Sequence, residues 1–287
     1  MRRRWCEAER RADMTNDPRM CVLVSRVLVL GLCLLVTSVV VGQNTSDDGV
    51  AGARAALLHF IELSNRKALR SPEARTLLVG EAAKWDTDSF GNLAPNPDTV
   101  VVVEKGFAVG RIQWHGENNY VADFYFYLGY FRQWKIGAMR RLALTGIVEM
   151  AYNGLKSRKT LTTEEQDQLS NLELVLASDE ALRAWFAKQQ RAMNALAELT
   201  HSMRTAVFIS PNQQNSDYPE IRKLLAELHL DGLEVHEDGN VEVTIGGVTD
   251  NSVGFIYSPS NHPPQIEPNS YIWVEKVADK WFLFRTT

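Results

Sequence analysis

The stretch FYFYLGYFRQW, residues 124–134, places seven aromatic side chains in eleven positions. Its alternation predicts a β-strand, in which successive side chains point to opposite faces of a sheet. One face would carry only bulky apolar groups, Phe124, Phe126 and Leu128. The other would combine two phenols with a carboxylate, Tyr125, Tyr127 and Asp123. We expect the first face in a packed core. We expect the second to line a cavity, because buried tyrosine hydroxyls usually need a hydrogen-bond partner.

The first 42 residues differ from the rest of the chain. Seven arginines precede an unbroken uncharged run from Val27 to Gly42. The run has the length of a secretory apolar segment and is shorter than the roughly 20 residues that span a bilayer. Val40 and Gly42 suit signal cleavage before Gln43. We therefore expect residues 1–42 to be a signal peptide and the protein to be exported, either periplasmic or secreted. The alternative is an uncleaved membrane anchor formed by residues 21–42.

Without this leader the chain is acidic and lacks cysteine. Residues 1–42 hold seven of the 31 basic and four of the 35 acidic residues, which leaves 24 and 31 and a net charge of −7. Such a charge argues against nucleic acid or an anionic membrane surface as a partner. Cys6, Cys21 and Cys33 all lie in the leader. A processed chain would therefore have no disulfide framework, thiol nucleophile or thiolate metal site.

The next part of the chain has an α+β pattern. A polar tether at residues 43–50 leads to a predicted helix at 51–69. A second helix is predicted from Ser71 and Pro72, as N-cap and first helical residue, to Trp85. Four strands follow in an antiparallel meander, TVVVVE, FAVGRIQWH, YVADFYFYL and WKIGAMRRL. Helices followed by a meander predict N-terminal helices packed on an antiparallel sheet.

The last of these strands carries a family resemblance. FRQWKIGAMRRL is similar to the Trp-Lys-Ile closing strand of the NTF2-like (cystatin-like cone) superfamily, and the resemblance covers residues 52–142. It implies a curved sheet around a cone-shaped cavity. Enzymes of this superfamily place acidic or histidine residues inside the cone, above a lining of aromatics. None of their catalytic patterns matches this sequence residue by residue.

The second half repeats the order of helices and then sheet. Residues 160–205 are predicted helical, with a capping box at Thr162 and Glu165 and a second N-cap at Ser178. A short helix capped near Asp217 and ending at Gly232 precedes a C-terminal antiparallel sheet. We therefore expect an NTF2-like α+β domain at 51–155, and a helical segment with a second sheet at 160–287. The closing hairpin VADKWFLFRTT again sets Trp beside Lys, which leaves open whether one helix–sheet unit occurs twice.

The sequence contains no motif for a cofactor or a metal. It has no P-loop, dinucleotide fingerprint, HExxH or GxSxG. No two of its six histidines are spaced two or four apart, so no strand or helix presents a pair as ligands. DTDSFGN imitates the start of a calcium loop but places Phe90 where an oxygen ligand belongs. We expect no cofactor and no metal.

Asp123 is the candidate acid or base, and two roles stay open for it. As the general base of an isomerase or dehydratase it would be desolvated, with a raised pKa. As a structural residue it would form an ion pair with Arg111 across the hairpin, which is an ordinary way to stabilise a sheet. That pairing follows if Trp114 lies opposite Tyr120, because Arg111 then lies opposite Asp123.

The leading functional prediction is non-catalytic. We expect a small apolar ligand or a protein partner to bind in the cone-shaped cavity, lined by Tyr125, Tyr127 and Arg111. The alternatives are the enzyme that uses Asp123, and a purely structural module of the envelope or the secreted medium. A membrane contact is expected only through the N-terminal segment, if that segment is not cleaved.

Overall fold

The computed structural model describes residues 48–94, 100–104, 106–116, 121–142, 145–201, 203, 207–212, 217–249, 251–267 and 269–286. These residues belong to one compact unit, Thr45–Thr287. The predicted leader, the predicted tether up to residue 47 and the turn at 117–120 lie outside the described residues.

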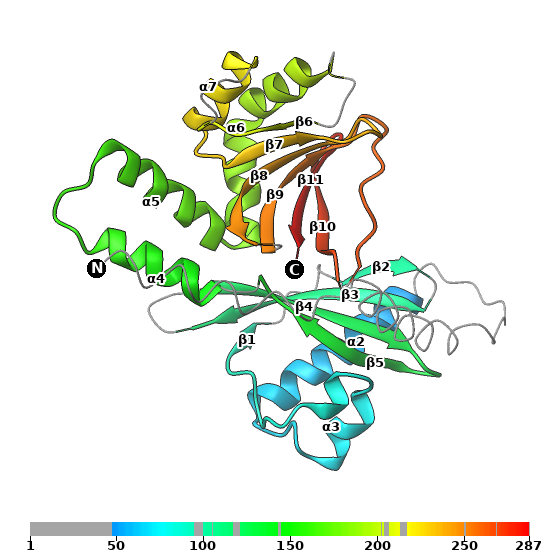
Figure 1. Cartoon of the computed structure of the whole chain (residues 1–287). Helices are drawn as coiled ribbons and strands as arrows, with labels where there is room; N and C mark the ends of the chain where they lie inside the picture. Colours follow the sequence, from blue (N-terminus) through cyan, green and yellow to red (C-terminus); the bar gives the residue numbers. More distant parts are fainter. Residues whose placement is uncertain are drawn as a thin grey trace, which may run out of the picture. The chain divides into compact units, whose positions relative to one another are not determined.

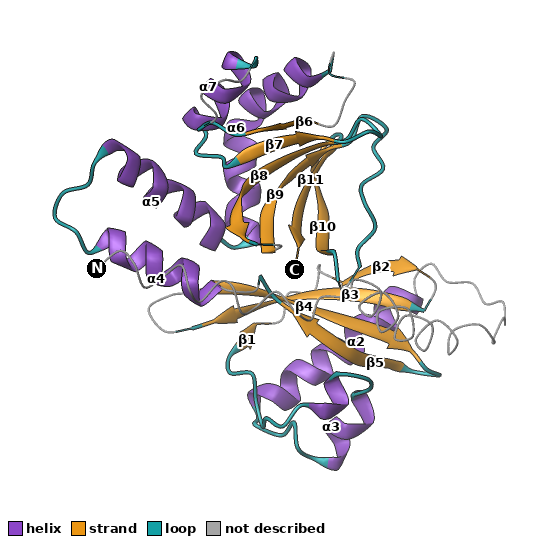
Figure 2. Ribbon diagram, viewed as in Figure 1, coloured by secondary structure: helices purple, strands orange, loops and turns teal. Residues whose placement is uncertain are grey.

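The fold class is α+β, as predicted, with two antiparallel sheets (Figures 1 and 2). In the described ranges the α-helices are α2 (Asp48–Asn65), α3 (Pro72–Leu77), α4 (Thr145–Lys156), α5 (Thr163–Leu176), α6 (Asp179–Thr200) and α7 (Pro219–Glu227). No helix in these ranges is both long enough and apolar enough to span a membrane.

The first sheet has the strand order β1-β3-β4-β5, and β2 also pairs with β3. Its strands are β1 (Leu93–Ala94), β2 (Val100–Glu104), β3 (Phe107–His115), β4 (Val121–Tyr130) and β5 (Trp134–Arg140). Helices α2 and α3 cover one face, and that face carries Phe124, Phe126 and Leu128 in a buried core. The Phe126 ring lies 5.1 Å from the Phe60 ring of α2, measured between centroids. The predicted core face of the aromatic strand is therefore confirmed.

Helix α2 approaches this sheet closely because β3 contains a glycine. A Cβ atom added at Gly110 would lie only 2.2 Å from Cδ2 of Leu57 in α2. Any larger residue at this position would push the helix side chain away from the sheet.

Three predicted helix starts are confirmed, whereas the first helix was predicted at 51–69 and α2 instead begins at Asp48, inside the predicted tether, and ends at Asn65. Ser71 caps α3, the capping box of Thr162 is present at α5, and Ser178 caps α6. The second helix ends at Leu77 rather than near Trp85, because Leu78 leaves the helix to form a β-bridge with Ile136. A 3-10 turn, Ala82–Lys84, then completes this segment.

Further along the chain, the short helix predicted near Asp217 is α7. It begins at Pro219 and ends at Glu227, and Gly232 is the first residue of the next strand rather than the end of the helix. Helix α4 lies where the sequence pattern predicted no helix, and it packs against α5.

The second sheet is curled into a half-barrel (Figure 1) and has the strand order β10-β11-β9-β8-β7-β6. Its strands are β6 (Val207–Ile209), β7 (Gly232–Val235), β8 (Val241–Val248), β9 (Asn251–Tyr257), β10 (Tyr271–Ala278) and β11 (Trp281–Thr286). Phe186 of α6 packs on Phe255 and Trp281, with ring centroids 4.9 and 5.4 Å away. Leu182, Met193 and Leu196 of the same helix are buried with them, so α6 packs on the sheet and shares the core of this half.

Candidate functional site

The pairing of β3 with β4 places Arg111 and Asp123 on one face, two residues away from the predicted register. Asp123 lies opposite Gln113, and Arg111 lies opposite Tyr125. The predicted register was wrong for a simple reason. A shift of two residues leaves every side chain on the same face, so the alternation in the sequence does not distinguish the two registers.

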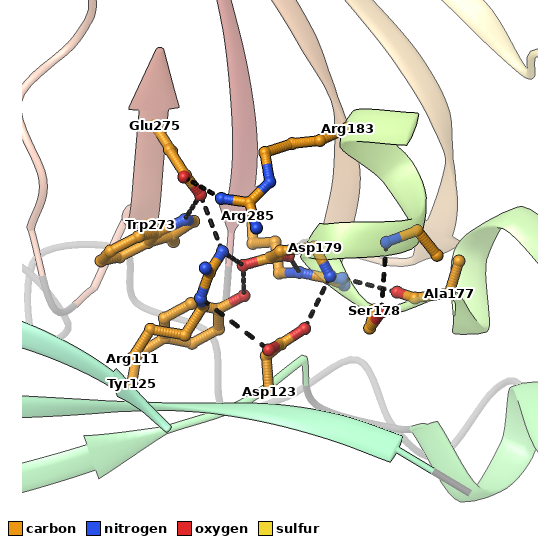
Figure 3. Close-up of polar contacts among 11 residues, drawn as sticks. Arg111, Asp123, Tyr125, Ala177, Ser178, Asp179, Arg183, Trp273, Glu275 and Arg285 are labelled. Carbon is orange, nitrogen blue, oxygen red and sulfur yellow. Dashed lines mark hydrogen bonds and ion pairs between the residues drawn. The ribbon is translucent and has the colours of Figure 1, made fainter. Parts of the chain in front are cut away.

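Asp179, the first residue of α6, is at the centre of a buried polar network (Figure 3). Its Oδ1 accepts a hydrogen bond from Arg285 Nε at 2.8 Å. Its Oδ2 accepts one from the Tyr125 hydroxyl at 2.7 Å and one from Arg111 Nη1 at 3.2 Å. Asp179, Tyr125, Arg111 and Arg285 are all buried. Hydrogen bonds that involve ionised groups are among the strongest in proteins, so the four residues form a tight cluster.

Asp123 binds the same helix from the first sheet. Its Oδ2 accepts a hydrogen bond from the backbone N–H of Asp179 at 2.7 Å, and its Oδ1 lies 3.9 Å from Arg111 Nε. The first N–H groups of a helix have no partner within the helix, and a carboxylate is favoured near its positive end. Asp123 supplies that partner, and its side chain is only 1% exposed.

Strands β10 and β11 complete the network. Glu275 Oε2 accepts hydrogen bonds from Arg111 Nη1 at 2.8 Å and from Trp273 Nε1 at 3.2 Å, while Oε1 pairs with Arg183. The Trp273 ring stacks on the Tyr125 ring, with centroids 5.2 Å apart, and the Arg111 guanidinium lies 5.6 Å from the Trp273 centroid. Three arginines therefore face three carboxylates, and the contacts run from the first sheet to the second.

The electrostatics differ between the two buried aspartates. Burial raises the pKa of Asp123 to about 6, and the nearby charge of Asp179 adds to this effect. Burial also acts on Asp179, but there the charges of Arg285 and Arg111 outweigh it, so the pKa of Asp179 is lowered. Burial likewise raises the pKa of the Tyr125 phenol well above its ordinary value, which keeps the hydroxyl protonated as a donor.

A small cavity of about 30 Å³ lies beside Asp123. It is lined by Val121, Ala122, Asp123, Arg141, Leu142, Thr145, Val175, Leu176, Ala177 and Arg285. Ligand pockets usually measure about 300–1,000 Å³, whereas a single water needs only about 10–15 Å³ on this scale. The space next to the carboxylate therefore suits water rather than a substrate.

The two tyrosines expected to line a cavity contact protein instead. Tyr125 is stacked on Trp273, and the Tyr127 hydroxyl donates a hydrogen bond to the carbonyl oxygen of Ile272 at 2.8 Å. Both tyrosines are buried together with Ile272 and Trp273. The space over this face of the sheet, where we expected a ligand, is occupied here by residues of β10.

Both of the roles that we considered for Asp123 have a counterpart in its surroundings. The carboxyl has a raised pKa, as expected of a general base, and it also pairs with Arg111, as expected of a structural residue. The raised pKa and the pairing with Arg111 therefore do not distinguish a general base from a structural residue. The hydrogen bond to the start of α6 and the size of the neighbouring cavity favour the structural role.

Sequence reasoning missed five members of the network, Asp179, Arg183, Trp273, Glu275 and Arg285. Only Arg285 had a visible signal, since it is a charged residue at the end of the apolar run WFLF in a strand. A charge inside a buried strand requires a partner. The described residues contain no group of three or more His, Cys, Asp or Glu placed to hold a metal.

The fold and the network define an α+β protein of two antiparallel sheets connected through a buried ionic cluster. No protein-family model, curated protein or solved structure matches this chain.

Proposed function

We propose that this protein is an exported, non-catalytic binding module that contacts another protein through the exposed side of α4. The packing of α2 and α3 on one face of the first sheet supports the NTF2-like arrangement proposed for residues 52–142. The binding surface of this proposal is a helix rather than the inside of a cone, because Trp273 and Ile272 cover the tyrosine face.

The observation that carries the proposal is that α4 is apolar on two sides. Val148 and Leu155 are buried, as expected for a helix that packs on its own protein. On the adjacent side Ile147 is 51% exposed and Met150 is 70% exposed. Ala151 and Gly154 are also exposed and continue this line at helical spacing. Methionine is flexible and polarizable, which suits it to binding surfaces.

The buried network fits a scaffold better than a reaction centre. Its carboxylates and arginines contact one another, and Asp123 accepts a hydrogen bond from the first backbone N–H of α6. Breaking one partner of such a pair would leave a buried charge uncompensated. The network therefore holds the two sheets together beside the hairpin formed by α4 and α5.

Site-specific photo-crosslinking in cells that make the protein tests this proposal. A photoreactive amino acid at Met150 is expected to give a defined adduct, and Ile147→Lys is expected to abolish that adduct without changing the thermal midpoint. The matched control is the same amino acid at Gln168, which is exposed on α5. Equal adducts from positions 150 and 168, or adducts that survive Ile147→Lys, would contradict the proposal. An adduct of twice the chain mass would indicate a second copy as the partner.

A proton-transfer enzyme is the second candidate, because the pKa of Asp123 is raised to about 6. A catalytic carboxylate must be reachable by small molecules. Under this candidate, a water-soluble carbodiimide with a small amine would label Asp123 in the native protein at pH 6, before it labels the fully buried Asp179. If mass spectrometry finds both residues protected until the protein unfolds, the enzyme candidate fails and the binding module stands.

A further inference from the structure

The turn between β4 and β5 exposes aromatic side chains at a site apart from α4. We call residues 130–135, YFRQWK, the hairpin tip. Tyr130 is 54% exposed and Phe131 is 60% exposed, and Arg132 and Gln133 are exposed beside them. Adjacent exposed aromatics at the apex of a turn are unusual, because turns favour Gly, Asn, Asp and Ser.

Local contacts hold these rings in place. The Phe131 N–H donates to the carbonyl oxygen of Gln133 at 2.9 Å, and Arg132 adopts a φ of 67° at the apex. The Tyr130 ring lies edge-on against the ring of Trp134, with centroids 5.5 Å apart. Trp134 itself is buried in the first core. The Tyr130 ring is therefore fixed to the sheet, and the Phe131 ring lies over Gly129, where an added Cβ would be 2.7 Å from Phe131 Cε2.

The charges of the hairpin tip are all positive. Arg132 and Lys135 are the charged residues of the segment, and it contains no carboxylate. Aromatic residues with one apolar and one polar end gather at the interface between a bilayer and water. Basic residues beside them are attracted to anionic headgroups. The hairpin tip combines both kinds of group.

The start of α2 lies at the same place. A Cβ atom added at Gly52, in the first part of α2, would lie 2.8 Å from Trp134 Cδ1. In the sequence only residues 43–47 separate the uncharged run Val27–Gly42 from Asp48, the first residue of α2. Five extended residues span at most about 18 Å. If the leader is retained in a membrane, this short spacing keeps the start of α2 close to that membrane, and with it the hairpin tip.

We propose that the hairpin tip docks on the surface of an anionic lipid bilayer, with Phe131 and Tyr130 at the interface and Arg132 and Lys135 on the headgroups. The acidic charge of the chain as a whole opposes broad adhesion to such a surface. The contact is therefore local, and it needs the apolar and the basic residues together.

A fluorescence experiment on the full-length chain tests this. Cys6, Cys21 and Cys33 are replaced by Ser, and an environment-sensitive dye is attached at Gln133→Cys, which leaves both exposed rings in place. The matched control carries the dye at Gln168→Cys on α5. Each protein is mixed with vesicles of phosphatidylcholine alone or with added phosphatidylglycerol, and nitroxide-labelled lipids serve as quenchers.

The dye at position 133 is expected to be quenched on anionic vesicles, whereas the dye at 168 is not. Arg132→Gln together with Lys135→Gln is expected to weaken the contact about 30-fold, since each basic residue contributes about fivefold near an anionic surface. Phe131→Ser is expected to weaken it as well. Equal quenching at 133 and 168, or equal quenching on neutral and anionic vesicles, would overturn the proposal. Energy transfer between labelled tips without vesicles would also overturn it, because the tip would then be an interface between copies.

Discussion

The Oδ2 atom of Asp123 accepts a hydrogen bond from the backbone N–H of Asp179 at 2.7 Å, so a buried aspartate of β4 meets a buried aspartate of α6 at the start of that helix. Their environments are opposite. Asp179 is surrounded by two arginines and a phenol, whereas Oδ1 of Asp123 accepts no hydrogen bond within the described residues. The same substitution, Asp to Asn, should therefore have opposite effects at these two positions.

Asp123→Asn should remove a dependence of stability on pH. The folded pKa of Asp123 is about 6 and the unfolded value is about 3.9, so between these pH values the folded state holds a proton that the unfolded state has lost. The contribution of this group to the free energy of unfolding therefore falls by about 3 kcal/mol as the pH rises from about 4 to 6. In Asp123→Asn this fall is expected to vanish, and the variant should be at least as stable as the wild type at pH 7.

Urea unfolding at a series of pH values from 4.5 to 7.5 would check this. The control is Asp86→Asn, since Asp86 has an exposed side chain that pairs with Arg70. The pKa of Asp179 is lowered, so its contribution to stability is lost only at pH values below those of this series. A slope that persists unchanged in Asp123→Asn would show that a different group titrates in this range.

Asp179→Asn should destabilise the protein strongly at neutral pH. The amide cannot neutralise the buried Arg285, whose Nε donates to Asp179 Oδ1, and it weakens the pairing of Arg111, which keeps its hydrogen bond to Glu275. Breaking a buried ion pair in this way costs about 3–5 kcal/mol. The free energy of unfolding from urea titration would measure the loss. A loss below about 1 kcal/mol, typical of an exposed pair, would contradict the view that this network is closed to water.

Removal of the hydroxyl should lower the free energy of unfolding more at Tyr125 than at Tyr127, although both tyrosines lie on the same face of the sheet. Tyr125→Phe loses a hydrogen bond to an ionised carboxylate, which costs about 1.5–3 kcal/mol. Tyr127→Phe loses one to a neutral carbonyl group, which costs about 0.5–1.5 kcal/mol. Thermal and urea unfolding of both variants would measure the difference. If Tyr127→Phe left stability unchanged and altered the binding of an apolar dye, the tyrosine face would line a cavity after all.

Patterns of short range in the sequence predicted much of the fold. The alternation from Phe124 to Leu128 correctly divided the side chains between two faces, because strand geometry alone decides it. The starts of α3, α5 and α6 were predicted from Ser71, Thr162 and Ser178, since an N-cap acts within three residues of its own position.

The site could not be predicted in the same way because its contacts are distant in the sequence. Arg111 and Asp179 are 68 residues apart, and Arg285 and Asp179 are 106 apart. No local pattern connects them. The register of β3 on β4 also stayed open, because two registers that differ by two residues bury the same side chains. Helix α4 was missed although its apolar residues Ile147, Val148, Met150 and Leu155 recur at helical spacing, so a local signal for this helix was present in the sequence.

Two phenylalanines of the aromatic stretch should respond very differently to truncation. Phe126 is fully buried and lies within 6.4 Å of the rings of Phe60, Trp85 and Phe90, so Phe126→Ala should lower the free energy of unfolding by about 3–5 kcal/mol. Phe131 is 60% exposed at the hairpin tip, and Phe131→Ala should change it by less than about 0.5 kcal/mol. Urea unfolding of both variants beside the wild type compares the same substitution at two places only five residues apart in the chain. A large loss from Phe131→Ala without lipid would mean that the exposed ring is part of the core of the folded protein, and its role at a membrane would then have to be abandoned.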